Sequence, residues 1–100
     1  HLRAEDQLGR LGGEEFLMLL PGLRLSAACQ RAEAMRRDVA QTRIDSGKLR
    51  VTLSLGVAEL DAGEALDDCL RRCDQALYRA KDAGRNTVVA AQGAVFATLS

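Results

Sequence analysis

Two short apolar stretches near the start of the chain predict a β-hairpin. They lie between Leu8 and Leu20 and are separated by Gly12 and Gly13. Paired glycines favour a hairpin turn because glycine adopts a positive φ without strain. The second stretch, which begins at Phe16, is almost continuously apolar, as expected of a strand covered on both faces. A Pro-Gly pair ends it.

Two later segments repeat apolar residues with the period of a helix. The first is expected to begin after Ser26, a candidate N-cap, and to run to about Gln41. Its apolar stripe is Leu25, Ala28, Ala32, Met35 and Val39, and the charged residues expected mostly in water are Arg31, Glu33, Arg36, Arg37 and Asp38. The second helix is predicted from about Ala65 to Ala83, with Gly84 as the residue that ends it.

Residues 49–58 alternate between two kinds of side chain, which predicts a strand. One face carries Val51, Leu53, Leu55 and Val57, and the other carries Thr52, Ser54 and Gly56. A last short strand is expected from Thr87 to Ala91, whereas the tail from Gln92 has no strong pattern. The element order β-β-α-β-α-β therefore predicts an α+β fold, with helices packed on a central mixed or antiparallel sheet.

Composition and charge narrow the class of protein. Fourteen Lys and Arg balance fourteen Asp and Glu, so no net field draws the whole molecule to nucleic acid or to a membrane. No apolar run approaches the roughly 18 residues of a membrane span. Cys69 and Cys73 share a helical face with Leu66, Leu70 and Leu77, and with Cys29 they make an odd set without CxxC spacing. We interpret them as buried small hydrophobic residues in a reducing compartment, which places the protein in the cytoplasm.

The hairpin turn is the first candidate for chemistry. Gly12 and Gly13 lack the Cβ atoms that would keep a phosphate away from the backbone. Glu14 and Glu15 follow at once, and Mg²⁺ prefers a few carboxylate oxygens together with substrate phosphates. Strand alternation points the two carboxylates to opposite faces, so one of them is expected to reach a metal. A solvated hairpin without a metal site would carry the same residues.

Two pairs of charged residues are further candidates. Lys81 and Arg85 lie four residues apart at the end of the second helix and could converge on one polyphosphate. Cations are also favoured at a helix C-terminus by the macrodipole alone. Arg3 and Asp6 precede the hairpin and could together read a guanine edge, or could form a surface ion pair.

Together these segments resemble the GGDEF domain, the family of diguanylate cyclases, which condense two GTP into cyclic di-GMP. Arg3-x-x-Asp6 followed after five residues by GGEEF matches the start of the pattern, residues 51–57 look like the family strand T-x-S-x-G-V, and DQALYRAKDAGRN at residues 74–86 looks like its last signature. The resemblance spans about residues 2–90. It implies a nucleotidyl-cyclase (ferredoxin-like) fold, with residues 1–91 as the C-terminal part of a GGDEF domain and residues 92–100 as a tail.

The resemblance also implies the roles of the motif residues. Glu14 would bind two Mg²⁺ (or Mn²⁺) ions and help to activate a ribose 3′-hydroxyl, and Glu15 is the second acid of the catalytic motif. Gly12 and Gly13 would let GTP approach. The 3′-hydroxyl of one GTP would attack the α-phosphate of another, and pyrophosphate would leave.

By the same resemblance Lys81 and Arg85 would hold the GTP phosphates. Arg3 and Asp6 match the family's inhibitory site, where the product cyclic di-GMP binds. A helix arginine that often completes this site is replaced by Ala34.

The resemblance implies partners and missing parts as well. Each domain would hold one GTP, so two domains must face each other in a homodimer. The family's N-terminal strand and helices, with another metal-binding Asp and the guanine-reading residues, do not appear in this chain, which we therefore expect to be inactive alone. A sensory domain is expected upstream, either in a cytoplasmic protein or in a membrane-anchored one, and nucleic acid is not an expected partner. The alternative is a non-catalytic module that binds GTP or cyclic di-GMP and regulates a partner domain; the retained GGEEF, Lys81 and Arg85 favour the enzyme.

Overall fold

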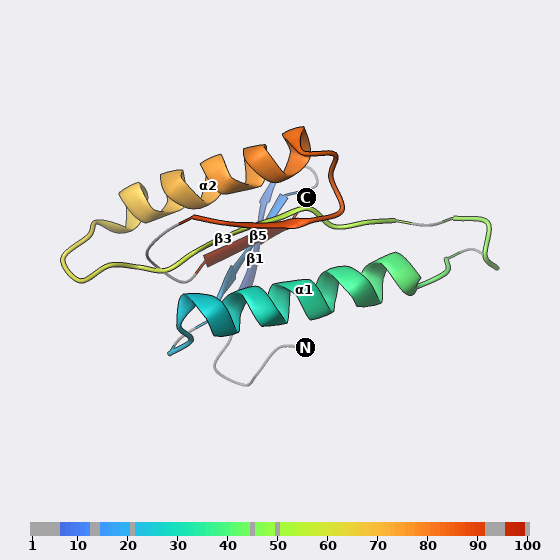
Figure 1. The fold of residues 1–100 in the computed structure, drawn as a ribbon, viewed down its shortest axis with the longest axis horizontal. Helices are drawn as coiled ribbons and strands as arrows, with labels where there is room; N and C mark the ends of the chain where they lie inside the picture. Colours follow the sequence, from blue (N-terminus) through green and yellow to red (C-terminus); the bar gives the residue numbers. More distant parts are fainter. Residues whose placement is uncertain are drawn as a thin grey trace.

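The described part of the chain forms a mixed sheet between two helices. A computed structural model describes residues 7–12, 15–20, 22–44, 46–49, 51–91 and 96–99. Its elements are β1 (Gln7–Gly12), β2 (Glu15–Leu19), α1 (Leu25–Gln41), β3 (Leu55–Ala58), α2 (Leu66–Asp82), β4 (Val88–Ala90) and β5 (Phe96–Leu99). The strand order is β1-β2-β5-β3-β4, with α1 and α2 on either side of the sheet (Figure 1). The predicted α+β fold with helices on a central mixed sheet is confirmed.

The predicted hairpin is present. β1 and β2 pair antiparallel, with Leu8 opposite Met18 and Arg10 opposite Phe16. The register shifts before the last pair, in which Gly12 faces Glu15. Gly12 therefore stands at the turn end of the hairpin, as the sequence predicts, and Gly13 lies outside the described residues.

The predicted strand 49–58 is shorter in the structure, where only its last four residues form the strand β3 among the described residues. β3 pairs in parallel with β4 and antiparallel with β5. Earlier in the segment, Ile44 and Leu49 form an isolated bridge. This part of the α1–β3 connection extends away from the sheet (Figure 1), and the side chain of Val51 is 40% exposed. Alternation alone therefore overestimated the length of the strand.

A strand that the sequence did not predict completes the sheet. β5 lies in the tail, where the pattern is weak, and it pairs antiparallel with both β2 and β3. It thereby joins the hairpin to the rest of the sheet. Four residues are too few for a recognisable period, so the neighbouring strands supply what makes this segment a strand.

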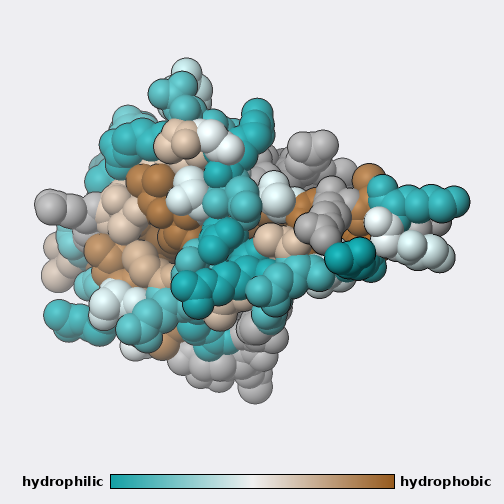
Figure 2. Space-filling model, turned by 45° about the vertical axis from the view of Figure 1, so that its right-hand side comes forward, coloured by the Kyte–Doolittle hydropathy of each residue, from teal (hydrophilic) through white to brown (hydrophobic). Residues whose placement is uncertain are grey.

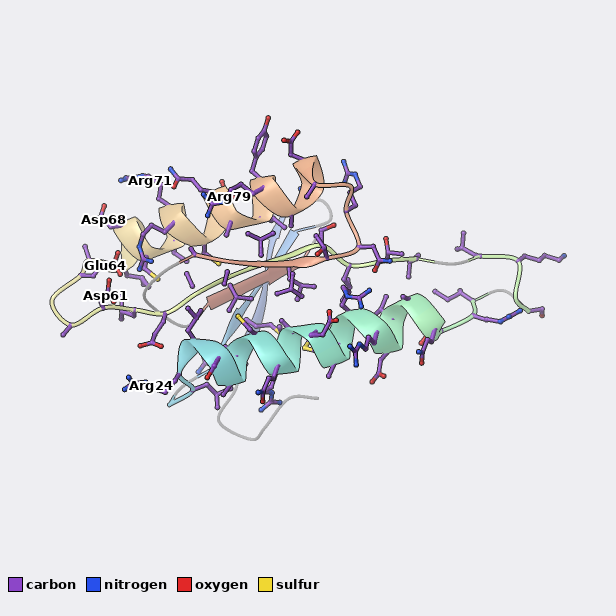
Figure 3. All side chains as sticks on the ribbon, viewed as in Figure 1. Arg24, Asp61, Glu64, Asp68, Arg71 and Arg79 are labelled. Atoms are coloured by element: carbon purple, nitrogen blue, oxygen red, sulfur yellow. The ribbon has the colours of Figure 1, made fainter. Side chains whose placement is uncertain are left out.

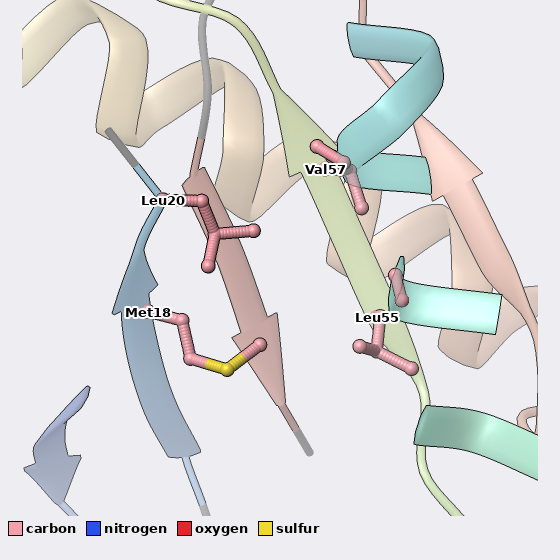
Figure 4. Packing of buried hydrophobic residues seen from close by; sticks show 6 residues of the cluster. Met18, Leu20, Leu55 and Val57 are labelled. Carbon is pink, nitrogen blue, oxygen red and sulfur yellow. The ribbon is translucent and has the colours of Figure 1, made fainter. Parts of the chain in front are cut away.

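Two apolar clusters hold the layers together. One lies between α1 and the sheet and consists of Met18, Leu20, Ala28, Ala32, Leu55 and Val57 (Figure 4). The other packs α2 on the opposite face and consists of Ala58, Cys69, Cys73, Ala76 and Ala91. All three cysteines are free. Cys69 and Cys73 are fully buried, as predicted, whereas Cys29 is only partly buried. Leu66, expected on the same helix face, is 52% exposed because it is the first residue of α2.

The prediction of Ser26 as the N-cap of α1 is wrong. The helix begins at Leu25, its N-cap position is Arg24, and no side chain at that position caps it. Ser26 lies inside the first turn and is exposed. The carboxylate of Glu59 accepts a hydrogen bond from the Leu25 N–H at 2.6 Å instead. A residue at the end of β3 therefore does what a local N-cap would do.

Arg72 of α2 fastens the connection between β3 and α2. Its guanidinium donates two hydrogen bonds to Glu64, at 2.6 and 2.8 Å, and a third to the carbonyl of Glu59 at 3.1 Å. The Arg72 hydrogen bonds lower the pKa of Glu64. Glu64 and Asp61 lie together beside the start of α2 (Figure 3).

Apolar side chains also reach the surface, where polar residues frame them (Figure 2). Among the residues whose side chains the structure describes, the large ones that are at least 40% exposed are Ile44, Leu49, Val51, Leu60, Leu66 and Tyr78. None of the helices in the described ranges is long and apolar enough to cross a bilayer.

Candidate functional site

The sheet brings the two main candidate segments to one of its ends. Its register places Phe16 of β2, Leu99 of β5, Leu55 of β3 and Val88 of β4 in one row. β2 begins just before this row, directly after the hairpin turn, and β4 begins in it. Three strand spacings separate Phe16 from Val88, or about 15 Å. The end of β1 at Gly12 and the start of β2 at Glu15 therefore lie at the same end of the sheet as the turn that precedes β4.

The structure describes the residues on either side of the acidic hairpin sequence. Gly12 and Glu15 are the last paired residues of β1 and β2. Gly13 and Glu14 lie outside the described residues, as do Arg3 and Asp6 of the predicted inhibitory pair. Within the described ranges, no group of three or more His, Cys, Asp or Glu side chains could hold a metal ion. The carboxylates that fit Mg²⁺ chemistry are those of the hairpin sequence.

α2 ends in a Schellman motif, as its glycine predicts. Gly84 has a φ of +112° and its N–H donates to the carbonyl of Lys81 at 3.3 Å. The N–H of Arg85 donates to the carbonyl of Ala80 at 3.0 Å. These are the two hydrogen bonds that define the motif. Lys81 is half-buried in the last turn of the helix and Arg85 is exposed just beyond it.

The turn after α2 is strained and anchored. Arg85 and Asn86 have φ values of +64° and +47°, in the left-handed region that residues with a Cβ rarely adopt. The N–H of Asn86 donates to Oγ of Ser54 at 3.1 Å, and its side-chain Oδ1 accepts from Nη1 of Arg36 at 2.9 Å. Ser54 is only 2% exposed. Both anchors lie far from the turn in sequence.

Arg36 is a residue that the sequence analysis missed. It was expected mostly in water, but its side chain is 19% exposed and contacts the turn. A signal was present, because Arg36 follows Ala32 by four residues and so lies beside the apolar stripe of α1. We grouped Arg36 with the other charged residues because its charge was given more weight than its position beside the apolar stripe.

Comparisons with known proteins agree with this arrangement. A family model described as "Diguanylate cyclase, GGDEF domain" matches residues 1–87. The chain is 48% identical over 89 residues to diguanylate cyclase DgcM of Escherichia coli (strain K12), and 38% identical over 94 residues to response regulator PleD of Caulobacter vibrioides (strain NA1000 / CB15N). Each alignment covers 89% of this chain, but only 22% of DgcM and 21% of PleD. The chain thus spans about a fifth of the length of these relatives.

A solved structure shows the same fold. The crystal structure of the GGDEF domain of DgcB from Caulobacter crescentus, in complex with c-di-GMP, matches with a TM-score of 0.79 at 33% identity. The match covers 88% of this chain and 54% of that one. With the family model matching residues 1–87 of 100, this chain belongs to the GGDEF domain family of diguanylate cyclases.

Proposed function

We propose that the protein that contains this chain is a diguanylate cyclase, which condenses two GTP into cyclic di-GMP and pyrophosphate. The observation that carries the proposal is the shared sheet end, at which Gly12 and Glu15 of the GGEEF hairpin lie together with the turn that contains Arg85. A nucleotide placed there could meet the carboxylates of one turn and the cations of the other. The kinship with diguanylate cyclases supports the same reaction.

We assign different roles in the reaction to the motif residues of the chain. Lys81 and Arg85 hold the phosphates of GTP, where an ammonium and a guanidinium both suit phosphate oxygens. Gly12 and Gly13 let the nucleotide approach the hairpin backbone. Glu14 holds the Mg²⁺ (or Mn²⁺), and Glu15 is the second acid of the motif.

The reaction joins two nucleotides. The 3′-oxygen of one GTP forms a bond to the α-phosphorus of the other, its proton is removed, and the bond to pyrophosphate breaks. Bound metal ions would supply charge stabilisation to the attacking and leaving oxygens. A second, equivalent step closes the ring. Because each domain holds one GTP, turnover requires a homodimer whose domains face each other.

Product feedback and input complete the proposal. Arg3 and Asp6 form an inhibitory site for cyclic di-GMP, since a guanidinium fork and a carboxylate suit a guanine edge. Cyclic di-GMP in the related DgcB domain supports a product site in this family. A sensory domain upstream, in the cytoplasm or attached to a membrane anchor, would control the activity.

The test is Glu14→Gln in the full-length protein, assayed with GTP and Mg²⁺ by the release of pyrophosphate. Removal of one charged ligand should cost at least about 3 kcal/mol of transition-state stabilisation, so turnover falls by a hundredfold or more. Glu14→Asp, which keeps the carboxylate, should retain activity, and circular dichroism checks that both variants fold. Unchanged turnover in Glu14→Gln would remove Glu14 from the site.

The alternative function is a non-catalytic module that binds GTP or cyclic di-GMP and regulates a partner domain. The same assay separates the two functions. A wild-type protein that binds GTP in a titration but releases no pyrophosphate is such a module.

A further inference from the structure

Arg85 lies between two fixed points of the backbone. Before it, the Schellman hydrogen bond from its own N–H to the carbonyl of Ala80 ends α2. After it, Asn86 is anchored through both its N–H and its side chain. The next residue, Thr87, accepts a hydrogen bond from the Leu55 N–H at 2.9 Å. A turn with two consecutive left-handed residues costs conformational energy and persists only where its surroundings hold it.

An ion pair with Glu33 fixes the orientation of the Arg36 side chain. Its Nε and Nη2 donate to the two carboxylate oxygens of Glu33, at 2.5 and 3.1 Å, in a two-pronged ion pair. This leaves Nη1 to donate to Oδ1 of Asn86. The Glu33 hydrogen bond raises the pKa of Arg36, and Arg36 lowers that of Glu33. The guanidinium is therefore held in one plane by α1, on the opposite side of the sheet from α2.

From this geometry we propose that Arg36 and Asn86 are positioning residues for the triphosphate of GTP. The Arg36–Asn86 hydrogen bond keeps the turn in its left-handed form and so keeps Arg85 where a phosphate can meet it. The inference rests on the proposed function, which gives Arg85 its ligand. Arg36 acts through Asn86, and its own guanidinium is already bonded to Glu33 and Asn86.

A purely structural role for the same hydrogen bond predicts a different result. If the bond only held α1 against the turn, its loss would lower stability and leave nucleotide affinity unchanged in the folded protein. If the bond positions Arg85, its loss weakens binding of the triphosphate at temperatures where the protein is fully folded. Affinity and stability must therefore be measured on the same variants.

The test uses the full-length protein and two substitutions that keep the net charge. Arg36→Lys keeps the cation but cannot bond Glu33 and Asn86 in the same fork. Asn86→Gly keeps a residue that tolerates positive φ and removes only the acceptor. Arg37→Lys is the matched control, since Arg37 also pairs with Glu33, at 3.3 Å, and is 66% exposed. The dissociation constant of GTPαS with Mg²⁺, a slowly reacting analogue, is measured by calorimetric titration, and urea midpoints are recorded beside it.

We expect Arg36→Lys and Asn86→Gly each to weaken GTPαS binding about fivefold to tenfold, which corresponds to the net contribution of one typical hydrogen bond. The double variant should lose no more than the worse single one, because both substitutions break the same bond. Arg37→Lys should bind within about twofold of wild type. With GTP as substrate, KM should rise more than kcat falls.

Two results would overturn the inference. One is wild-type affinity in both single variants, and the other is a double variant whose loss equals the product of the two single losses. If Arg36→Lys does not fold, Asn86→Gly alone decides by the same affinity measurement. Arg85→Ala tests the underlying function separately: an affinity equal to wild type there, or no binding by the wild type, removes the phosphate site itself.

Discussion

Gly56 shows how a single position can be fixed by its neighbours. A Cβ on Gly56 would lie 2.3 Å from the Leu77 nitrogen and 2.4 Å from the Cys73 carbonyl oxygen, both backbone atoms of α2. Sγ of Cys73 also donates to the Gly56 carbonyl at 3.2 Å. The helix therefore packs directly on the backbone of β3. This close approach explains the glycine in the T-x-S-x-G-V strand, which the sequence showed only as a letter of a motif.

Gly56→Ala should destabilise the protein by at least about 1–3 kcal/mol, because α2 must move away from β3 to admit a methyl group. Gly9→Ala is the matched control: Gly9 also lies in a strand, and a Cβ there meets nothing within 4 Å. Chemical denaturation of both variants measures the difference. Equal unfolding midpoints for the two variants would contradict the close packing of α2 on β3.

Charged side chains help to hold the N-terminus of α2 in position. Arg72 bonds Glu64 through two nitrogens, and Glu64 also accepts from the Asp61 N–H at 3.2 Å. The ionised form of Glu64 accepts these hydrogen bonds more strongly than the protonated form does. Residues 61–64 lie between the predicted strand and the predicted second helix, and nothing in the sequence indicated that Arg72, eight residues after Glu64, would bind this segment.

The pH dependence of stability tests this element. The pKa of Glu64 is lowered from its ordinary value of 4.5, chiefly by the hydrogen bond with Arg72. Its contribution to stability is therefore fully present above pH 4.5 and is lost as the pH falls through the lower pKa of the folded state. We expect Glu64→Gln to be less stable than wild type at pH 7, with the difference shrinking towards pH 3.

Urea midpoints between pH 7 and pH 3 measure this effect. Asp74→Asn, at an exposed position in the middle of α2, controls for the loss of one negative charge. A difference between Glu64→Gln and wild type that stayed constant over the whole range would show that ionisation of Glu64 does not contribute.

The architecture of the molecule depends on β5. This strand lies between β2 and β3, so it connects the hairpin with the part of the sheet that both helices cover. It also lies beyond residues 1–87, the part of the chain that the family model matches. The resemblance implies a further, N-terminal strand that does not appear in this chain. In this chain its own last residues pair with β2.

Thr98→Pro tests that arrangement. Thr98 pairs with Leu17 on one side and Gly56 on the other, and a proline in a central strand removes a ladder hydrogen bond. In the 100-residue chain we expect a loss of at least about 1–3 kcal/mol, the cost of one unpaired backbone group. Hydrogen exchange should also show that β1 and β2 lose protection. Unchanged stability of the 100-residue chain would contradict the central position of β5. If the substitution destabilised the 100-residue chain but had no effect in the full-length protein, another segment would hold this position there.

Several features of this protein could be predicted from its sequence because they depend on interactions between residues close in the chain. The paired glycines marked the hairpin, the helical period gave α2 within one residue of its ends, and Gly84 marked its Schellman motif. These features depend on residues that are close in the chain, so a short window contains their cause. The family motifs were equally visible, and they named Glu14, Lys81 and Arg85 as site residues, an assignment that stays a prediction.

Contacts between distant residues could not be read in this way. Glu59 caps a helix 34 residues earlier, and Arg36 bonds Asn86 across 50 residues. The alternating pattern begins at residue 49, well before β3 starts at Leu55, and the tail that contains β5 has no strong pattern. Each of these outcomes depends on which layers meet when the sheet and the helices pack. A hydrogen bond needs its two groups within about 3 Å of each other, and only the folded chain brings them there.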